Sequence, residues 1–447
     1  MIIFDTIVSQ TTANFKAAIG VVRLVGPLAF EILSHLVKKD VSKMEERITY
    51  LGKIYEDKDN EDSIIDQAMY VIYKGKKSFC GEDTVEFYLH GSLLIISQVV
   101  QACCKYGARQ ATNGEFSMKA FYNGKLDLTE AEAINQLINA KTNRSKKFAL
   151  NSLQGRTSNL LKELKNDLNM IEAEIEVNID YPEFDEDVDL VSKVETLLPD
   201  LIIKAKNLLT KSKESLYLFN GIKVAIVGEP NVGKSTLLNN LLQEDKAIVT
   251  EIPGTTRDVV EGEKEYNGLL YHFYDTAGIR EADDKIEKIG IEKSYKATIN
   301  ADIVLVLSTK ISGVEELKKL NLESLINSNK VIYIATKKDL YGETLKADLT
   351  ISNKDKNYNQ IYEKINEKLN ISNLDEEGLT SEREVTILNK FISILEEIHN
   401  DLENQITIDV VEIKLVEATK LIDSLLGVDS SLEDIYSTIF KHFCVGK

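Results

Sequence analysis

The chain has few cysteines, few histidines and no long apolar run, and these absences exclude several classes of protein. Its four cysteines, at positions 80, 103, 104 and 444, form no CxxC pair, so we expect a reduced, cytoplasmic protein. The five histidines are scattered without metal-ligand spacing. The most apolar segment, GSLLIISQVVQACC, is too short and too polar to span a bilayer, and the N-terminus has no signal-peptide pattern. We therefore expect no association with a membrane.

Positive charge is also scarce. The chain has 54 Lys and Arg against 72 Asp and Glu, a net charge of −18. A protein this acidic lacks the broad basic face that drives binding to nucleic acid. If RNA is a partner, tight binding needs a local basic patch or a second protein. The acidic stretch YPEFDEDVDL, residues 181–190, is interpreted as a solvated turn between helices.

The periodicity of apolar residues changes along the chain and predicts four segments. Residues 1–123 combine short β-branched runs with helical ones, which indicates a mixed α/β domain. Residues 124–217 are helical, with Thr129 as a plausible N-cap. In residues 218–376 apolar strands alternate with helices, as in a parallel sheet, and a hairpin turns at Asn267-Gly268. Residues 377–447 are helical again, so an α/β domain interrupts a helical one.

The strand KVAIVG leads into GEPNVGKST, residues 228–236, which fits the phosphate-binding pattern G-x-x-x-x-G-K-[ST]. Gly228 and Gly233 let backbone N–H groups turn toward phosphate oxygens, and the following helix directs its positive end at them. Lys234 is suited to the β and γ phosphates and Ser235 to Mg²⁺. The residues predicted to contact the nucleotide here are Asn231, Val232, Gly233, Lys234, Ser235 and Thr236.

Four more elements follow in the order expected of a GTPase. PGTTRD supplies Thr256 as a second hydroxyl for Mg²⁺. DTAG supplies Asp275, which can hold Mg²⁺ through water, then Thr276, Ala277 and Gly278, whose N–H can sense the γ-phosphate. TKKD supplies Thr336, Lys337 and Asp339. Asp339 can accept bonds from the N1–H and 2-amino groups of guanine, which adenine lacks. SNK supplies Ser352 and Asn353 for the base.

Two positions depart from common GTPase patterns. The motif TKKD usually begins with Asn; the hydroxyl of Thr336 could still bond to guanine N7. The residue after DTAG is Ile279, which cannot orient water as the glutamine of Ras-like enzymes does, so the catalytic group must come from elsewhere. The acidic candidates downstream are Glu281, Asp283, Asp284, Glu287 and Glu292. No arginine finger is evident, and the amide of Asn231 could bind a monovalent cation instead.

These motifs resemble those of translation-factor-like GTPases, and the whole chain resembles one family. The segments DTIV, GEDTVEFYLHG, NGEFSMKAFYNGKLDLTEAEAINQLI, AIVTEIPGTTRD and the terminal CVGK are similar to those of the MnmE (TrmE) tRNA-modification GTPases. The resemblance implies a multidomain fold of α/β and all-α parts. Its N-terminal α/β domain would bind tetrahydrofolate and dimerise, and its helical domain would be interrupted by a Ras-like P-loop GTPase domain.

The resemblance also implies a function. A K⁺-dependent GTPase with GTP/GDP and Mg²⁺ would act with an FAD-dependent MnmG-like protein, in a heterotetramer or larger assembly. Together they would add an aminomethyl or carboxymethylaminomethyl group to carbon 5 of the wobble uridine of certain tRNAs, with tRNA bound mostly through the partner. The carbon donor would be 5-formyl- or 5,10-methylene-tetrahydrofolate.

By the same resemblance, roles can be assigned to individual residues. Glu287 would orient the attacking water, and Cys444 is a candidate for chemistry on the uridine or its carbon donor, with a packing role as the alternative. The K⁺ ligands would be Asn231, Thr250, Ile252 and Thr255. The folate contacts would be Arg23, Glu86, Lys125 and Lys447. The first loop, TTANFKAAIG, departs from the Gly- and Pro-rich loop of the family.

A different class of function competes with this one. The chain could be a ribosome-assembly or RNA-associated GTPase switch, since a GTPase domain alone does not fix function. Such a factor would normally carry a basic RNA-binding appendage. The flanking segments here are neutral or acidic, which favours the tRNA-modification hypothesis.

Overall fold

The structure is a computed structural model that describes residues 5–180, 190–243, 262–275, 295–309, 312–337, 347–352, 358–371, 377–404, 406–428, 433–441, 443 and 446. The chain forms two compact units. One contains Met1–Asn135, Ser152–Leu198 and Ser393–Lys447, and the other contains Gln136–Asn151 and Pro199–Ile392. Within the described ranges, no helix has the length and apolar character needed to cross a membrane.

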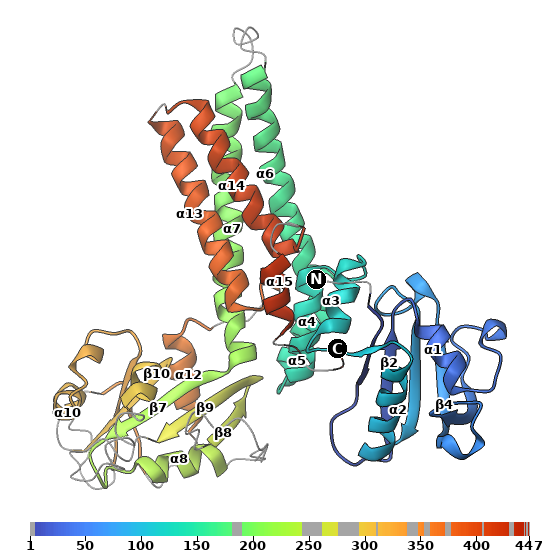
Figure 1. Cartoon of the computed structure of the whole chain (residues 1–447). Helices are drawn as coiled ribbons and strands as arrows, with labels where there is room; N and C mark the ends of the chain where they lie inside the picture. Colours follow the sequence, from blue (N-terminus) through green and yellow to red (C-terminus); the bar gives the residue numbers. More distant parts are fainter. Residues whose placement is uncertain are drawn as a thin grey trace. The chain divides into compact units, whose positions relative to one another are not determined.

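The first unit contains a six-stranded sheet in the order β3-β4-β5-β2-β1-β6. Its strands are β1 (Ile7–Gln10), β2 (Ile19–Val25), β3 (Tyr50–Tyr55), β4 (Ile64–Tyr73), β5 (Thr84–His90) and β6 (Arg109–Gln110). Short 3₁₀ turns lie at Val41–Lys43, Glu61–Ser63 and Gly75–Lys77. Helices α1 (Ala29–Leu36) and α2 (Leu93–Lys105) pack on one face, over alternating strand residues such as Val22, Leu24 and Phe87 (Figure 1). The predicted mixed α/β domain is confirmed.

The opposite face of this sheet has two parts. At the β1 end it is covered by Phe116 of α3 (Glu115–Tyr122), which clusters with Ile7, Val25 and Cys80. Toward β3 it carries a row of aligned neighbours, Leu51, Met69, Tyr88 and Val21. Leu51 is 70% exposed and Met69 is 42% exposed. We call this second part the open sheet face.

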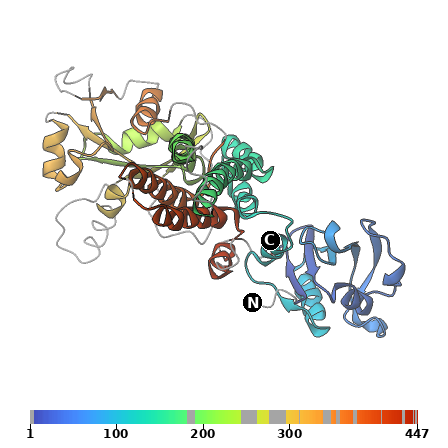
Figure 2. The ribbon, with the colours of Figure 1, turned by 90° about the horizontal axis from the view of Figure 1, so that it is seen from above.

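Helices follow the sheet, as predicted. They are α3, α4 (Leu128–Asn139), α5 (Asn143–Leu153), α6 (Arg156–Asp180), α7 (Leu190–Asn220), α13 (Glu382–Glu403), α14 (Ile408–Leu426) and α15 (Glu433–Phe440). In Figures 1 and 2, α6 runs along α14. The pairing follows from spacing, because α6 buries Leu161, Leu164, Leu168, Ile171 and Ile175, three or four residues apart. The acidic stretch 181–189 lies outside the described residues.

The predicted N-cap of α4 is wrong by two residues. The helix begins at Leu128, so Thr129 lies inside it and is fully buried. Asp127 is the capping residue, because its carboxylate accepts the backbone N–H of Glu130 at 3.0 Å. The Glu130 carboxylate in turn accepts the backbone N–H of Asp127 at 2.9 Å. This reciprocal pair is a capping box, and an aspartate fills it as well as a threonine does.

The second unit contains a sheet in the order β12-β11-β10-β7-β9-β8. Its strands are β7 (Ile222–Gly228), β8 (Gly262–Tyr266), β9 (Leu269–Asp275), β10 (Ile303–Ser308), β11 (Val331–Ala335) and β12 (Leu349–Thr350). All pairs are parallel except β8 with β9, which form the predicted hairpin through Asn267 and Gly268. The described helices between these strands and after them are α8 (Lys234–Gln243), α10 (Gly313–Lys319) and α12 (Asn359–Lys368), with a 3₁₀ turn at Glu323–Leu325.

Both faces of this sheet are buried, which explains the continuous apolar strands. Ile226 and Leu305 face a core shared with α8 and α12, while Val227 and Val306 face one shared with α10. This is the arrangement of an α/β domain with helices on both faces of a mostly parallel sheet. The predicted fold class, an α/β domain followed by a helical domain that a second α/β domain interrupts, is confirmed.

Candidate functional site

The phosphate-binding segment lies between β7 and α8, at the carboxyl end of a central parallel strand. β7 ends at Gly228 and α8 begins at Lys234. Lys234 Nζ donates to the carbonyls of Gly228 and Glu229, at 2.8 and 3.0 Å, so the ammonium lies over the loop. Asn231 has a φ of +59°, which turns the loop back toward the helix. A lysine and a helix N-terminus facing one loop can hold the phosphates of a nucleotide.

Two residues of the TKKD motif hold this loop from the neighbouring strand ends. Thr336 Oγ1 donates to the carbonyl of Val232 at 2.7 Å, and Lys337 Nζ donates to the carbonyl of Asn231 at 2.6 Å. Both follow β11, which is separated from β7 by β10 alone. The structure therefore brings together the predicted residues of the first and fourth nucleotide motifs.

Helix α10 holds the same loop from another side, and no sequence motif indicated it. The Glu316 carboxylate accepts the backbone N–H of Glu229, and Lys319 Nζ lies 2.7 Å from the Glu229 carboxylate. Burial raises the pKa of Glu316. Ser312 begins the helix with a capping box closed by Glu315. The sequence here shows only a capping box followed by acidic residues and lysines. This pattern predicts that a helix begins, but not that the helix contacts the P-loop.

The remaining predicted nucleotide residues are partly described. Ser352 is buried after β12, and its carbonyl accepts Tyr358 OH at 3.4 Å. Asp275 is the last residue of β9. The other predicted residues of both sites that fall outside the described residues are Thr250, Ile252, Thr255, Thr256, Thr276, Ala277, Gly278, Glu287, Asp339, Asn353, Cys444 and Lys447. Their roles stay predictions.

In the N-terminal domain, two predicted folate residues meet beside the open sheet face. Arg23 Nε donates to Glu86 Oε1 at 2.9 Å, and Tyr88 OH donates to Glu86 Oε2 at 2.8 Å. The Arg23 guanidinium lies 5.5 Å from the ring centre of Phe79 and 5.6 Å from that of Phe116. Such a half-buried cation between two rings can bind an anionic aromatic ligand.

Sequence reasoning missed three members of this group. Tyr88 could have been found from strand alternation, because it is two residues from Glu86 and lies on the same face. Phe79 and Phe116 come from outside the strands and had no such signal. Lys125, another predicted folate residue, donates through Nζ to the carbonyl of Lys76 at 2.9 Å.

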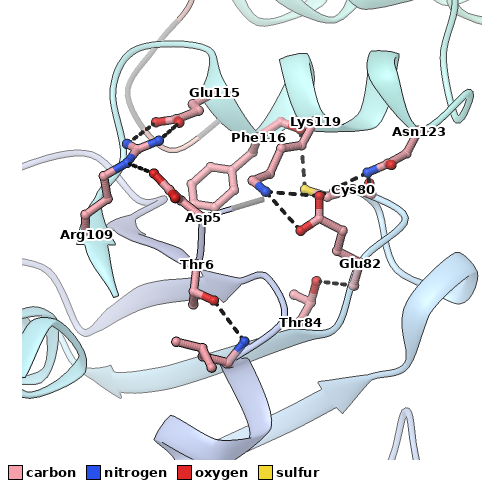
Figure 3. A network of polar contacts seen from close by, with 11 residues as sticks. Asp5, Thr6, Cys80, Glu82, Thr84, Arg109, Glu115, Phe116, Lys119 and Asn123 are labelled. Atoms are coloured by element: carbon pink, nitrogen blue, oxygen red, sulfur yellow. Dashed lines mark hydrogen bonds and ion pairs between the residues drawn. The ribbon is translucent and has the colours of Figure 1, made fainter. Parts of the chain in front are cut away.

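A polar network fastens α3 to the sheet (Figure 3). Arg109 pairs with both Asp5 and Glu115, and the buried Lys119 pairs with Glu82 at 2.9 Å. Cys80 Sγ donates to the carbonyl of Phe116 at 3.4 Å, and burial raises the pKa of its thiol to about 12. A thiol with that pKa is not a nucleophile at neutral pH, so Cys80 has a packing role here. The network keeps Phe116 fixed beneath Arg23.

The C-terminal segment lies against α3, the start of α4 and the loop after β1. Phe440 and Phe443 pack with Met118 and Leu128. Asn113 Nδ2 reaches the carbonyl of Lys441 at 3.4 Å. Gly446 is buried, with so little room that an added Cβ would lie 2.4 Å from the carbonyl oxygen of Gln10. The last described residues of the chain are thus held against the loop after β1.

Comparison with protein families gives two matches that cover most of the chain. The family described as "GTP-binding protein TrmE N-terminus" matches residues 6–125. The family described as "MnmE helical domain" matches residues 128–444.

Curated relatives match over the full length. A protein of Fervidobacterium nodosum named "tRNA modification GTPase MnmE" is 38% identical over 99% of this chain and 98% of its own. A protein of the same name from Streptococcus sanguinis is 35% identical over 99% of both chains. Among solved structures, the G domain of the T. maritima FeoB iron transporter covers 33% of this chain and 98% of its own, at 28% identity and a TM-score of 0.24.

Proposed function

We propose that this chain, which belongs to the MnmE (TrmE) family of tRNA modification GTPases, adds a substituent to carbon 5 of the wobble uridine of certain tRNAs. The chain is a GTP hydrolase that acts in tRNA modification. The substituent is an aminomethyl or carboxymethylaminomethyl group. The observation that carries the enzymatic part is the P-loop, with Lys234 over it and Thr336 and Lys337 bonded to its carbonyls.

The residues at the P-loop fit a Mg²⁺-bound guanine nucleotide. Lys234 would bind the phosphates, and Ser235, the next residue of α8, would supply a hydroxyl to Mg²⁺ with Thr256. The metal, when bound, neutralises charge that develops on the phosphates. The N-terminus of α8 adds donors that need no rearrangement. Asp339 selects guanine over adenine.

K⁺ is the cation that we propose in place of an arginine finger, held by Asn231, Thr250, Ile252 and Thr255. The support is that Asn231 lies within the P-loop and that Lys337 holds its carbonyl, which fixes the residue. A fixed charge beside the phosphates can replace a finger worth about 10³-fold in rate. Hydrolysis should therefore be much faster in K⁺ than in Na⁺ at equal ionic strength. Equal rates would remove this part of the proposal.

The N-terminal domain is proposed to bind 5-formyl- or 5,10-methylene-tetrahydrofolate. The support is the Arg23 and Glu86 pair, since the cation suits the glutamate tail and the carboxylate suits the amino groups of the pterin. Lys125 and Lys447 are proposed as further contacts, and Gly446 brings the chain end to the loop after β1. Cys444 is close to Gly446 in sequence, and we propose it for the carbon-transfer chemistry.

The net charge of the chain and its exposed apolar residues support the partners that we propose. A homodimer through the N-terminal domain is supported by the open sheet face, where Leu51 and Met69 remain exposed. An FAD-dependent MnmG-like protein, in a heterotetramer or larger assembly, would supply most contacts to tRNA, because the net charge of −18 disfavours direct binding. We propose a cytoplasmic location, where tRNA is modified and the free cysteines stay reduced.

Mass spectrometry of tRNA nucleosides from cells lacking this protein tests the proposal. The substituted wobble uridines should disappear and return with a plasmid copy of the gene. Unchanged wobble uridines, together with an altered profile of ribosomal subunits, would instead favour the ribosome-assembly alternative.

A further inference from the structure

Thr336 is held between two neighbouring strands and the P-loop. The residue follows β11 and is 7% exposed. Its backbone N–H donates to the carbonyl of Ser308, the last residue of β10, at 2.8 Å. Its hydroxyl donates to the carbonyl of Val232 at 2.7 Å and also lies 3.3 Å from the carbonyl oxygen of Ser308. The side chain therefore ties the end of β11 to the P-loop.

A hydroxyl has a single proton to donate, and guanine N7 is an acceptor. Thr336 could bond to N7 only by giving up the Val232 carbonyl, which belongs to a residue that is 4% exposed. Leaving a buried acceptor without a donor disfavours a state by a factor of about 5 to 150, whereas one neutral hydrogen bond favours it by about 2 to 10. The exchange is unfavourable, so the hydroxyl stays on Val232.

We propose that Thr336 is a positioning residue for the P-loop and that, unlike the usual asparagine, it gives guanine N7 no hydrogen bond. An asparagine, the usual residue at this position, has two N–H groups and could serve both acceptors. The threonine serves one. The inference rests on the GTP binding of the family and not on the folate, potassium or partner parts of the proposed function.

The test compares GTP with 7-deaza-GTP, which lacks only the N7 acceptor. Calorimetric titration of the full chain should give dissociation constants that agree within about two-fold. A preference for GTP of about ten-fold or more would overturn the inference and leave the GTPase function intact. Absence of binding by both nucleotides would contradict the nucleotide function itself, so the two failures are distinguishable.

Three variants sharpen the test. Thr336→Asn should create a preference for GTP over 7-deaza-GTP of about five-fold, because the amide adds the missing donor. Thr336→Val should weaken both nucleotides equally, by about five-fold or more, because the Val232 carbonyl loses its donor. Thr336→Ser keeps the hydroxyl and should bind both like the wild type. Weakening of GTP alone in Thr336→Val would identify Thr336 as an N7 ligand and refute the proposal.

Discussion

Glu316 is a carboxylate that is 1% exposed and accepts the backbone N–H of the second P-loop residue, Glu229. Three positions further along α10, Lys319 binds the Glu229 side chain. The helix therefore holds the first residues of the loop through both backbone and side chain. Since a P-loop binds phosphate through the directions of its N–H groups, a contact that fixes one peptide plane also affects its neighbours.

We predict that Glu316→Ala weakens GDP binding by about five-fold or more, because the loop loses an acceptor worth about 1 kcal/mol or more. Glu316→Gln is the matched control. Its amide oxygen still accepts the N–H of Glu229, so its affinity should be near that of the wild type. Calorimetry with GDP measures both. Equal losses in the two variants would mean that the charge of Glu316, rather than its hydrogen bond, holds the loop.

The difference in stability between the wild type and Glu316→Gln is predicted to depend on pH. Burial raises the pKa of Glu316 above its ordinary value of 4.5, so the folded state keeps this proton to higher pH than the unfolded state. The stability that Glu316 contributes is complete below pH 4.5 and is lost as the pH rises through the folded pKa. Protection of the β7 amides in Glu316→Gln should therefore exceed that in the wild type increasingly from pH 4.5 to 7. Hydrogen exchange at several pH values measures it, and a constant difference would contradict the prediction.

The order of the motifs assigned the first and fourth motifs to one nucleotide site, but it did not predict the contacts that join them. Asn231 and Lys337, or Val232 and Thr336, are far apart in sequence but follow strands whose carboxyl ends share one edge of the sheet. Glu316 has no motif, because an acid on an amphipathic helix usually faces solvent. Its role depends on how α10 packs, and that depends on the whole core beneath it.

At the scale of elements, the β8–β9 hairpin connects the two segments that carry the predicted Thr256 and Gly278. Lys141 Nζ lies 2.9 Å from Glu263 Oε1 in β8, and His272 Nδ1 in β9 lies 3.2 Å from the same oxygen. Burial lowers the pKa of His272, so its ring is neutral at pH 7 and Lys141 balances the charge of Glu263. Arg144 also donates to the Asn267 carbonyl at 3.4 Å. The hairpin is thus attached to the segment that contains α5.

We predict that Lys141→Glu lowers tRNA modification but leaves GTP affinity within about two-fold of the wild type. The affinity should hardly change because a half-exposed ion pair is worth only about 1 kcal/mol and this one lies away from the P-loop. Modification should fall because this pair attaches the hairpin, which lies between the predicted Thr256 and Gly278, to the segment before α5. Lys146→Glu, a charge reversal at an exposed position of the following helix α5, is the control. The swap Lys141→Glu with Glu263→Lys should restore modification, measured as modified uridine per tRNA. Failure of the swap would exclude the pair as the link.

The C-terminal segment gives a second prediction at this scale. Gly446 has a φ of +93°, and an added Cβ would lie 2.7 Å from Thr11 Cα as well as close to the Gln10 carbonyl. Gly446→Ala should displace the segment and weaken 5-formyl-tetrahydrofolate binding by about ten-fold, since a charge-assisted contact of Lys447 is lost. Hydrolysis of GTP should not change. Calorimetry and a phosphate-release assay measure the two.

The control for this variant is Gly155→Ala. Gly155 also has a positive φ, +82°, but the nearest atom to an added Cβ is 3.5 Å away, on the flexible Glu130 side chain. It reports the cost of backbone strain without the clash. If Gly446→Ala bound folate as the wild type does, the chain end would have no part in the folate site.

At the scale of the whole molecule, the order of domains could be predicted from changes of periodicity, but the two compact units could not. The units are divided at four points, all within helices: 135–136 in α4, 151–152 in α5, 198–199 in α7 and 392–393 in α13. A long amphipathic helix keeps one pattern of apolar residues even where the elements that it packs against change. Sequence therefore predicts where such a helix begins and ends more readily than which unit each half joins.

The open sheet face leads to the last prediction, which concerns the assembly. Leu51 and Met69 are neighbours across β3 and β4, and exposed apolar side chains in register on a sheet are typical of an interface that a partner covers. A stable dimer buries about 800 Å² per partner, and a charge at its centre would lie unpaired. Leu51→Asp should therefore convert the proposed homodimer into monomers at micromolar concentration, as measured by sedimentation velocity. The control is Leu94→Asp, on α2, where a similarly exposed leucine lies on the helix-covered side of the sheet. The control should remain dimeric. An unchanged sedimentation coefficient for Leu51→Asp, in a protein that still binds GDP, would mean that the chain dimerises through another surface.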